Sequence, residues 1–343
     1  MKRGNFFWIV FSIVIALVVG TGIESKMGFW KKKKTTRYEL RKNIKDSLAS
    51  RWSADFDLVD IKSSLDDTIQ KAYLYKTKSS TPQPLVVSLH SWSFDYRQDD
   101  TLALLSKAKD INYIHPDFRG ENWNKNACCS DFVLTDIDAS IDYAIAHANV
   151  DTSKIYVIGR SGGGYATLAT FMKSKHRIRK FSAWVPLADL VKWYEETRMR
   201  KLYYADNILI CTHSKNNLLD KEVAIQRSPF YWNTPKEKLT YATLEIFTGV
   251  YDGLENVGPI PITQSINFYN KLLKDLAFPD SSQYISSKEK LSLLELRKPL
   301  GNFGKIGNRE ICLVKKANNV KITFFVGGHE ILSEFAFTNL INE

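Results

Sequence analysis

The sequence predicts an α/β protein with a mostly parallel, doubly wound sheet, and three observations support this prediction. Short runs of β-branched and apolar residues, such as 85–89 and 155–158, are typical of strands buried on both faces of a parallel sheet. Residues 132–148 and 263–276 carry apolar side chains at helical spacing. Such strands and helices alternate along the chain, which is the pattern of β-α-β units. A length of 343 residues, 44% of them hydrophobic and 25% charged, fits one main domain.

The expected elements begin near residue 56. Strands are expected at 58–61, 69–75, 85–89, 112–115, 155–158, 181–187, 243–248 and 320–326. Residues 189–235, rich in Tyr, Lys and Asn, predict a cap-like insertion over the carboxyl edge of the sheet. Residues 277–318 show no clear pattern, so no element is predicted there.

A glycine-rich reversal follows the strand at 155–158. Residues 159–163, Gly-Arg-Ser-Gly-Gly, fit the G-x-S-x-G nucleophile elbow, in which Ser161 occupies a strained turn between a strand and a helix. Glycines two positions before and after Ser161 avoid collisions with the neighbouring strand and helix. The dinucleotide-binding and P-loop glycine patterns are absent from the sequence. The elbow therefore predicts an α/β-hydrolase fold with Ser161 as nucleophile; a serine in an ordinary tight turn is the alternative.

A serine nucleophile requires a histidine base and a carboxylate that orients the histidine. In this fold their chain order is Ser, acid, His, and His329 lies on a glycine-rich loop just after a predicted strand. His329 is therefore the predicted base. Asp252, after the strand at 243–248, is the favoured acid, and Asp189 is the alternative acid, although it also fits a helix cap.

Two backbone N–H groups are expected to form the oxyanion hole. Gly162 N–H follows the nucleophile, and Trp92 N–H lies on the loop after the strand at 85–89. His90 on the same loop is expected to have a structural role. Arg160, inside the elbow, can pair with an acidic neighbour, project toward substrate or simply lie at the surface.

The motifs LVVSLHSWS, HPDFRGEN, VDTSKIYVIGRSGGGYATLAT, FSAWVPLADLVKWY, YDG with PIPITQSINFYN, and VGGHE resemble the catalytic domain of the prolyl oligopeptidase family of α/β-hydrolases. The resemblance covers about 55–343 and is closest to small, single-domain, mostly secreted peptidases or esterases. It implies Ser161 as nucleophile, Asp252 as acid and His329 as base. The sequence shows no β-propeller before this domain, which leaves a prolyl-peptidase specificity open.

These residues predict a serine hydrolase that forms an acyl-enzyme and needs no cofactor or metal; no H-E-x-x-H pattern is present. A carboxylic ester, on a carbohydrate as one option, is the favoured substrate. Aromatic side chains offer stacking faces for sugars in this interpretation, or else pack the core: Trp92, Trp123, Trp184, Trp193 and Tyr194. The alternatives are a serine-type peptidase acting on short peptides and an inactive, membrane-tethered binding protein with the same fold.

The N-terminal segment has its own composition. Residues 1–34 predict a signal peptide or membrane anchor with a basic flank. The apolar run at 6–23 is expected to form an N-terminal hydrophobic helix ahead of the domain, which would contact the membrane if uncleaved. Residues 35–55 predict a linker, and 56–343 the catalytic domain. Residues 1–50 contain 11 Lys and Arg against 3 Asp and Glu, so they account for most of the net charge of +11. Nucleic-acid binding is therefore not expected.

The location of the catalytic domain has two interpretations. The basic tract at 31–34 after the apolar run favours a cytoplasmic domain by the positive-inside rule, whereas the order basic, then apolar favours export. We favour a periplasmic or extracellular location on the family resemblance. One disulfide from Cys128 or Cys129 to Cys211 is a hypothesis that fits such a compartment. The sequence does not indicate the oligomeric state.

Overall fold

The computed structural model describes residues 52–342. Its strands are β1 (Asp57–Lys62), β2 (Ile69–Tyr75), β3 (Gln83–Leu89), β4 (Asn112–Pro116), β5 (Val150–Arg160), β6 (Lys180–Trp184), β7 (Thr243–Gly249), β8 (Lys305–Ile306), β9 (Arg309–Ala317) and β10 (Val320–Phe325). Its helices are α2 (Thr101–Ala108), α3 (Asp131–His147), α4 (Gly162–Lys173), α5 (Leu190–Met199), α6 (Tyr204–Cys211), α7 (Lys221–Gln226), α8 (Thr263–Asp275), α9 (Ser287–Leu296) and α10 (Ser333–Ile341), with short 3₁₀ turns at Pro229–Tyr231, Lys238–Thr240 and Ser281–Gln283.

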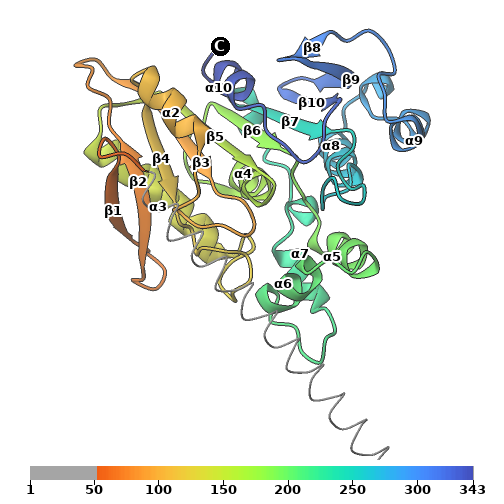
Figure 1. The fold of residues 1–343 in the computed structure, drawn as a ribbon, viewed down its shortest axis with the longest axis horizontal. Helices are drawn as coiled ribbons and strands as arrows, with labels where there is room; N and C mark the ends of the chain where they lie inside the picture. The colour runs from red at the N-terminus through yellow and green to blue at the C-terminus, as the bar shows by residue number, and fades with distance from the viewer. Residues whose placement is uncertain (1–51, 343) are drawn as a thin grey trace, which may run out of the picture. The chain divides into compact units, whose positions relative to one another are not determined.

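The strands form one sheet in the order β1-β2-β4-β3-β5-β6-β7-β10-β9-β8 (Figure 1). The six central strands, from β4 to β10 in that order, are mutually parallel, and the flanking strands pair antiparallel. The predicted mixed α/β architecture with a large, mostly parallel sheet is thus confirmed. Because the central strands are parallel, the loops that follow β3, β5, β7 and β10 emerge at the same edge.

Helices cover both faces of this sheet. Right-handed crossovers put α3, α4 and α8 on one face, since each leads the chain in the direction from β4 toward β10. The crossover through α2 runs the opposite way and lies on the other face, where α2 contacts α10. Parallel strands covered on both faces must be apolar throughout, and the β5 segment 155–158 is buried accordingly.

The strand predicted at 181–187 ends earlier, at Trp184. Val185 has φ 42°, a left-handed conformation that a β-branched residue rarely adopts, so the chain turns out of the sheet there. Its N–H still donates to Phe247 O at 2.6 Å. The early end of the strand brings the next residues over the carboxyl edge of the sheet, where α5 begins.

The segment predicted as a cap contains α5, α6 and α7, which lie together beside the sheet in Figure 1. A Cys128–Cys211 disulfide joins the loop before α3 to the end of α6, and this is one of the two pairings the sequence suggested. Cys129 and Cys312 are buried free thiols. The cap is therefore covalently linked to the body of the domain.

The region 277–318, for which no element is predicted, is ordered into α9 and the hairpin of β8 and β9. Ser286 caps α9 through a reciprocal pair of bonds with Glu289, a capping box visible in the sequence. The predicted signal peptide or anchor at 1–34 and most of the predicted linker lie outside the described residues. Within residues 52–342, no helix is long and apolar enough to cross a membrane.

Candidate active site

Ser161 lies where β5 ends and α4 begins. Its backbone has φ 60° and ψ −119°, a strained conformation for a residue with a side chain. Its N–H donates to Trp184 O at 2.9 Å, and its hydroxyl does not cap the helix that follows. The residue is 8% exposed. The elbow thus holds a hydroxyl at the carboxyl edge of the sheet without using it in the helix.

The glycines of the elbow allow close backbone packing. A Cβ on Gly159 would lie 2.4 Å from the Gly163 carbonyl, and a Cβ on Gly163 would lie 2.0 Å from Leu89 O. Real side chains do not approach backbone atoms this closely. These collisions, with the following helix and with neighbouring strand β3, are the ones predicted from the sequence for side chains at 159 and 163.

His329 and Asp252 form a hydrogen bond. His329 Nδ1 donates to Asp252 Oδ2 at 2.8 Å, while Asp252 Oδ1 accepts from Gly253 N–H at 2.9 Å and Ile260 N–H at 3.2 Å. The Asp252 side chain is fully buried and that of His329 is 16% exposed. Asp252 therefore fixes the His329 tautomer, with the proton on Nδ1 and Nε2 left as the basic nitrogen.

The loops that carry this pair are packed against each other. Tyr251 N–H donates to Gly327 O at 2.9 Å, and a Cβ on Gly258 would lie 2.0 Å from Asp252 Oδ1 and 2.7 Å from His329 Cβ. The loops follow adjacent strands β7 and β10, whose carboxyl ends meet at one edge. Their contact explains why residues 77 positions apart in sequence become hydrogen-bonded.

Ser161 lies at the same edge, and β6 and β7 separate its strand from β10. At about 4.8 Å per strand spacing, roughly 14 Å separates the strand axes, a gap that the histidine loop must bridge. Among the described residues, no hydrogen bond joins Ser161 Oγ to the imidazole. Hydrogen bonds to a nucleophile are often long in enzymes without substrate.

Asp189, the alternative acid, has a different role in the structure. It is the N-cap of α5, where its Oδ1 accepts from Lys192 N–H at 3.0 Å, and its Oδ2 accepts from Tyr231 OH at 3.1 Å. Both oxygens are thus engaged in holding the cap segment. No hydrogen bond between Asp189 and His329 occurs among the described residues.

The two predicted oxyanion donors belong to segments in contact. A Cβ on Gly162 would lie 2.3 Å from Trp92 N, so these backbones pass as closely as glycine allows. Neither N–H group donates to another group in the described part of the chain. Gly162 is also the first residue of α4, so the helix dipole adds positive potential there.

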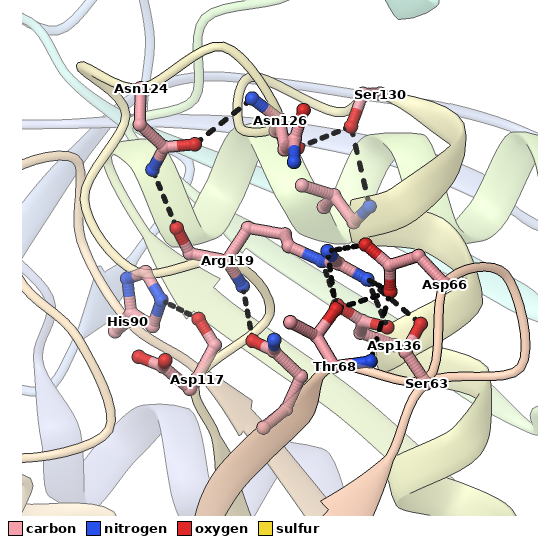
Figure 2. A network of polar contacts seen from close by, with 12 residues as sticks. Ser63, Asp66, Thr68, His90, Asp117, Arg119, Asn124, Asn126, Ser130 and Asp136 are labelled. Carbon is pink, nitrogen blue, oxygen red and sulfur yellow. Dashed lines mark hydrogen bonds and ion pairs between the residues drawn. The ribbon is translucent and has the colours of Figure 1, made fainter.

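His90, at the start of the oxyanion loop, is buried and held by stacking and polar contacts. Its ring stacks on Phe118 with centroids 3.8 Å apart, and its Nε2 is 2.6 Å from Asp117 O (Figure 2). Burial lowers the His90 pKa to about 4, so the ring is neutral at physiological pH and donates from one nitrogen. This environment agrees with a structural role for His90.

A buried ion-pair network, which the sequence does not predict, holds the segment after β4. Arg119 bonds to Asp66 and Asp136 and also to Ser63 and Thr68, as Figure 2 shows. Burial alone would lower the Arg119 pKa, but the two carboxylates outweigh it and raise that pKa. The network ties the β1–β2 turn to α3 and to the loop that ends at Cys128.

Most aromatic residues considered for sugar stacking are unavailable for it. Trp92 is 2% exposed, Trp184 0%, Trp193 1% and Tyr194 5%, and only Trp123 is partly exposed. Trp92 and Trp193 instead pack on each other with centroids 4.8 Å apart. The core-packing interpretation is therefore right for these four residues.

No group of His, Cys, Asp and Glu within residues 52–342 is arranged to hold a metal ion. Two surface cavities, of about 570 and 700 Å³, are lined by other parts of the domain and by none of Ser161, Asp252 and His329. The carboxyl edge of the sheet carries the Ser161 hydroxyl and the His329 imidazole with its Asp252 partner.

Comparison with known proteins gives a family match over part of the chain and several solved structures with a similar fold. Residues 100–233 match the sequence model described as the prolyl oligopeptidase family. Oligopeptidase B from Leishmania major superposes with a TM-score of 0.54 at 14% identity, covering 84% of this chain and 36% of that one. Prolyl oligopeptidase B from Galerina marginata superposes with 0.51 at 13% identity, covering 70% and 35%. A Mycobacterium tuberculosis puromycin-hydrolysing peptidase superposes with 0.50 at 15% identity, covering 64% and 34%.

The chain thus spans about a third of the length of these three structures, and at such identities the superpositions establish the fold alone. The sequence match covers the elbow and the cap helices, which carry the most distinctive motifs. Over residues 100–233 the sequence is thus similar to the prolyl oligopeptidase family, and the described part of the chain has the α/β-hydrolase fold.

Proposed function

We propose that the protein hydrolyses amide bonds of short peptides by acyl transfer, with Ser161 as nucleophile, His329 as base and Asp252 as the acid that orients it. The observation that supports the proposal most directly is the 2.8 Å bond from His329 Nδ1 to Asp252, because it leaves Nε2 free to accept a proton. The edge of the sheet that carries this pair also carries the strained Ser161 elbow.

The proposed reaction has two halves. Ser161 Oγ attacks the peptide carbonyl carbon while His329 Nε2 takes the hydroxyl proton, and Trp92 and Gly162 N–H groups stabilise the resulting oxyanion. Collapse breaks the C–N bond, and the imidazolium gives its proton to the departing amine. Water then attacks the acyl-enzyme with the same base, which releases the acid and restores Ser161.

Peptides are favoured over carbohydrate esters for two reasons. The matching family is named for a peptidase, and one of the superposed structures is a puromycin-hydrolysing peptidase. Four of the five aromatic side chains that would have recognised a sugar are buried. Simple esters remain a second candidate class, since an acyl-transfer site of this kind also attacks activated esters.

Labelling by a fluorophosphonate probe tests the proposal. Wild-type protein is expected to be labelled at Ser161 and to cleave a panel of short peptide p-nitroanilides, whereas Ser161→Ala loses both properties. Ser64→Ala, which removes an exposed hydroxyl at the β1–β2 turn, is the matched control and retains both. A folded wild-type protein that is neither labelled nor active would instead support the binding-protein alternative.

We also propose that the catalytic domain acts in an oxidising compartment outside the cytoplasm. The Cys128–Cys211 disulfide supports this location, because such bonds form and persist mainly in exported proteins. Peptide mapping of the native chain without reduction is expected to recover the two cysteines in one linked peptide pair. Recovery of both as free thiols would contradict the proposal.

A further inference from the structure

Arg160 directly precedes the proposed nucleophile and carries a charge that the fold leaves without a partner. It is partly buried at the end of β5, and its guanidinium forms no hydrogen bond or ion pair with any of residues 52–342. Burial lowers the Arg160 pKa, although arginine stays charged at any physiological pH. A half-buried cation without a counter-ion is costly to maintain, which makes this position unusual.

Asp100, the carboxylate that acts on Arg160, forms no hydrogen bond or ion pair with it in the described structure. Asp100 attracts the Arg160 charge, but its oxygens already accept from Leu102 N–H at 2.9 Å, Ser88 Oγ at 2.5 Å and Tyr113 OH at 2.6 Å. Asp100 is therefore committed to capping α2 and to the buried polar cluster beneath the sheet edge. Arg119 differs from Arg160, because all five of its N–H donors form hydrogen bonds, as expected of an arginine with a structural role.

Arg160 adjoins the groups proposed for catalysis. Its carbonyl accepts from Ser91 Oγ at 3.3 Å on the oxyanion loop. Its Cα lies about 3.8 Å from that of Ser161, as in any pair of adjacent residues. The start of α4 adds positive potential next to it.

We propose that Arg160 is a specificity residue that binds a carboxylate carried by the substrate next to the scissile bond. A guanidinium pairs with a carboxylate through two parallel hydrogen bonds, and substrate binding would supply the missing counter-ion. The carboxylate has two sources: an acidic side chain on the acyl side, or the free C-terminus of a short leaving peptide. This inference rests on the proposed peptidase function and adds the charge class of the substrate.

Isosteric substrate pairs test each source. The first pair is blocked Ala-Glu and Ala-Gln p-nitroanilide, and the second is a blocked tripeptide with a free or an amidated C-terminus. Wild type is expected to prefer the anionic member of whichever pair carries the carboxylate at the right place. The preference should be at least tenfold both in kcat/KM and in protection of Ser161 from fluorophosphonate. Arg160→Met is expected to reduce that ratio to near one, and Arg160→Lys to reduce it partly.

Arg177→Met is the matched control, because Arg177 is exposed ahead of β6, at the opposite edge of the sheet, and its loss changes the net charge equally. It should leave both ratios at their wild-type values. Efficient labelling of Ser161 with no preference in either pair, or a preference that persists in Arg160→Met, overturns this inference and leaves the proposed function intact. Absence of labelling overturns both.

Discussion

Replacing Asp252 with Asn changes one carboxylate oxygen to an NH₂ group and tests whether Asp252 orients the His329 imidazole. Asp252 Oδ1 accepts from two backbone N–H groups, those of Gly253 and Ile260, so an Asn oxygen must occupy that position to avoid two clashes between donors. The Asn NH₂ then faces His329 Nδ1, which must become an acceptor. The imidazole proton moves to Nε2, and this nitrogen can no longer accept a proton from Ser161.

The expected loss is about 10⁴-fold in kcat, which corresponds to roughly 5.5 kcal/mol of transition-state stabilisation. Stability should change little, because Asn preserves the size of the side chain and both backbone bonds. Steady-state kinetics on a p-nitroanilide peptide, together with thermal unfolding, measure the two effects separately.

Asp189→Asn is the matched control for this experiment. Asn caps a helix as well as Asp does, so α5 and the kcat value should persist within a small factor. A kcat for Asp252→Asn close to that of wild type would refute the proposed role of Asp252. If Asp189→Asn lost about 10⁴-fold in kcat and Asp252→Asn did not, Asp189 would be the acid.

Two further predictions concern the supports of the site. Arg119→Met leaves the Asp136 carboxylate buried without its cation, so it should lower the free energy of unfolding by about 3 to 5 kcal/mol. Arg198→Met, which breaks an exposed ion pair, is the control and should lower it by less than about 1 kcal/mol. Equal urea midpoints for the two variants would contradict this prediction. Gly162→Ala puts a Cβ 2.3 Å from Trp92 N and should separate the oxyanion donors, with a loss of about 10²-fold in kcat that Gly301→Ala, whose Cβ meets only the Phe303 ring, does not share. A kcat for Gly162→Ala equal to that of wild type would show that the two segments need not touch.

The parts of the site that sequence reasoning predicts are those specified by local backbone geometry. The elbow is recognisable because Gly159 and Gly163 are required wherever a strand and a helix pass this closely, and the requirement lies within five consecutive residues. His329 is recognisable because its loop follows an apolar strand directly. Each is defined by its immediate neighbours in sequence, so no long-range contact needs to be known.

The choice between Asp252 and Asp189 depends on contacts that the sequence does not specify. Both follow strands at the same edge, and they differ in their contacts: Asp252 bonds to His329, whereas Asp189 caps α5. The ion pairs of Arg119 are equally impossible to predict from sequence, because its partners come from a distant turn and from α3. The helix α9 is a different case: its capping box is local, but a weakly amphipathic helix of one buried residue gives no periodic signal.

The way the cap is attached has a consequence for how substrates are selected. Trp92 Nε1 donates to Asn207 Oδ1 at 3.2 Å, Ser93 Oγ lies 3.2 Å from Tyr203 OH, and the disulfide fixes the end of α6. The oxyanion loop is thus joined to the cap by side-chain bonds, and the disulfide joins the cap to the loop before α3. A lid that swings away would have to break these contacts and disturb the Trp92 donor as well. Selection by charge at Arg160 requires no such movement, because an anionic group can be attracted into a site whose shape is already formed.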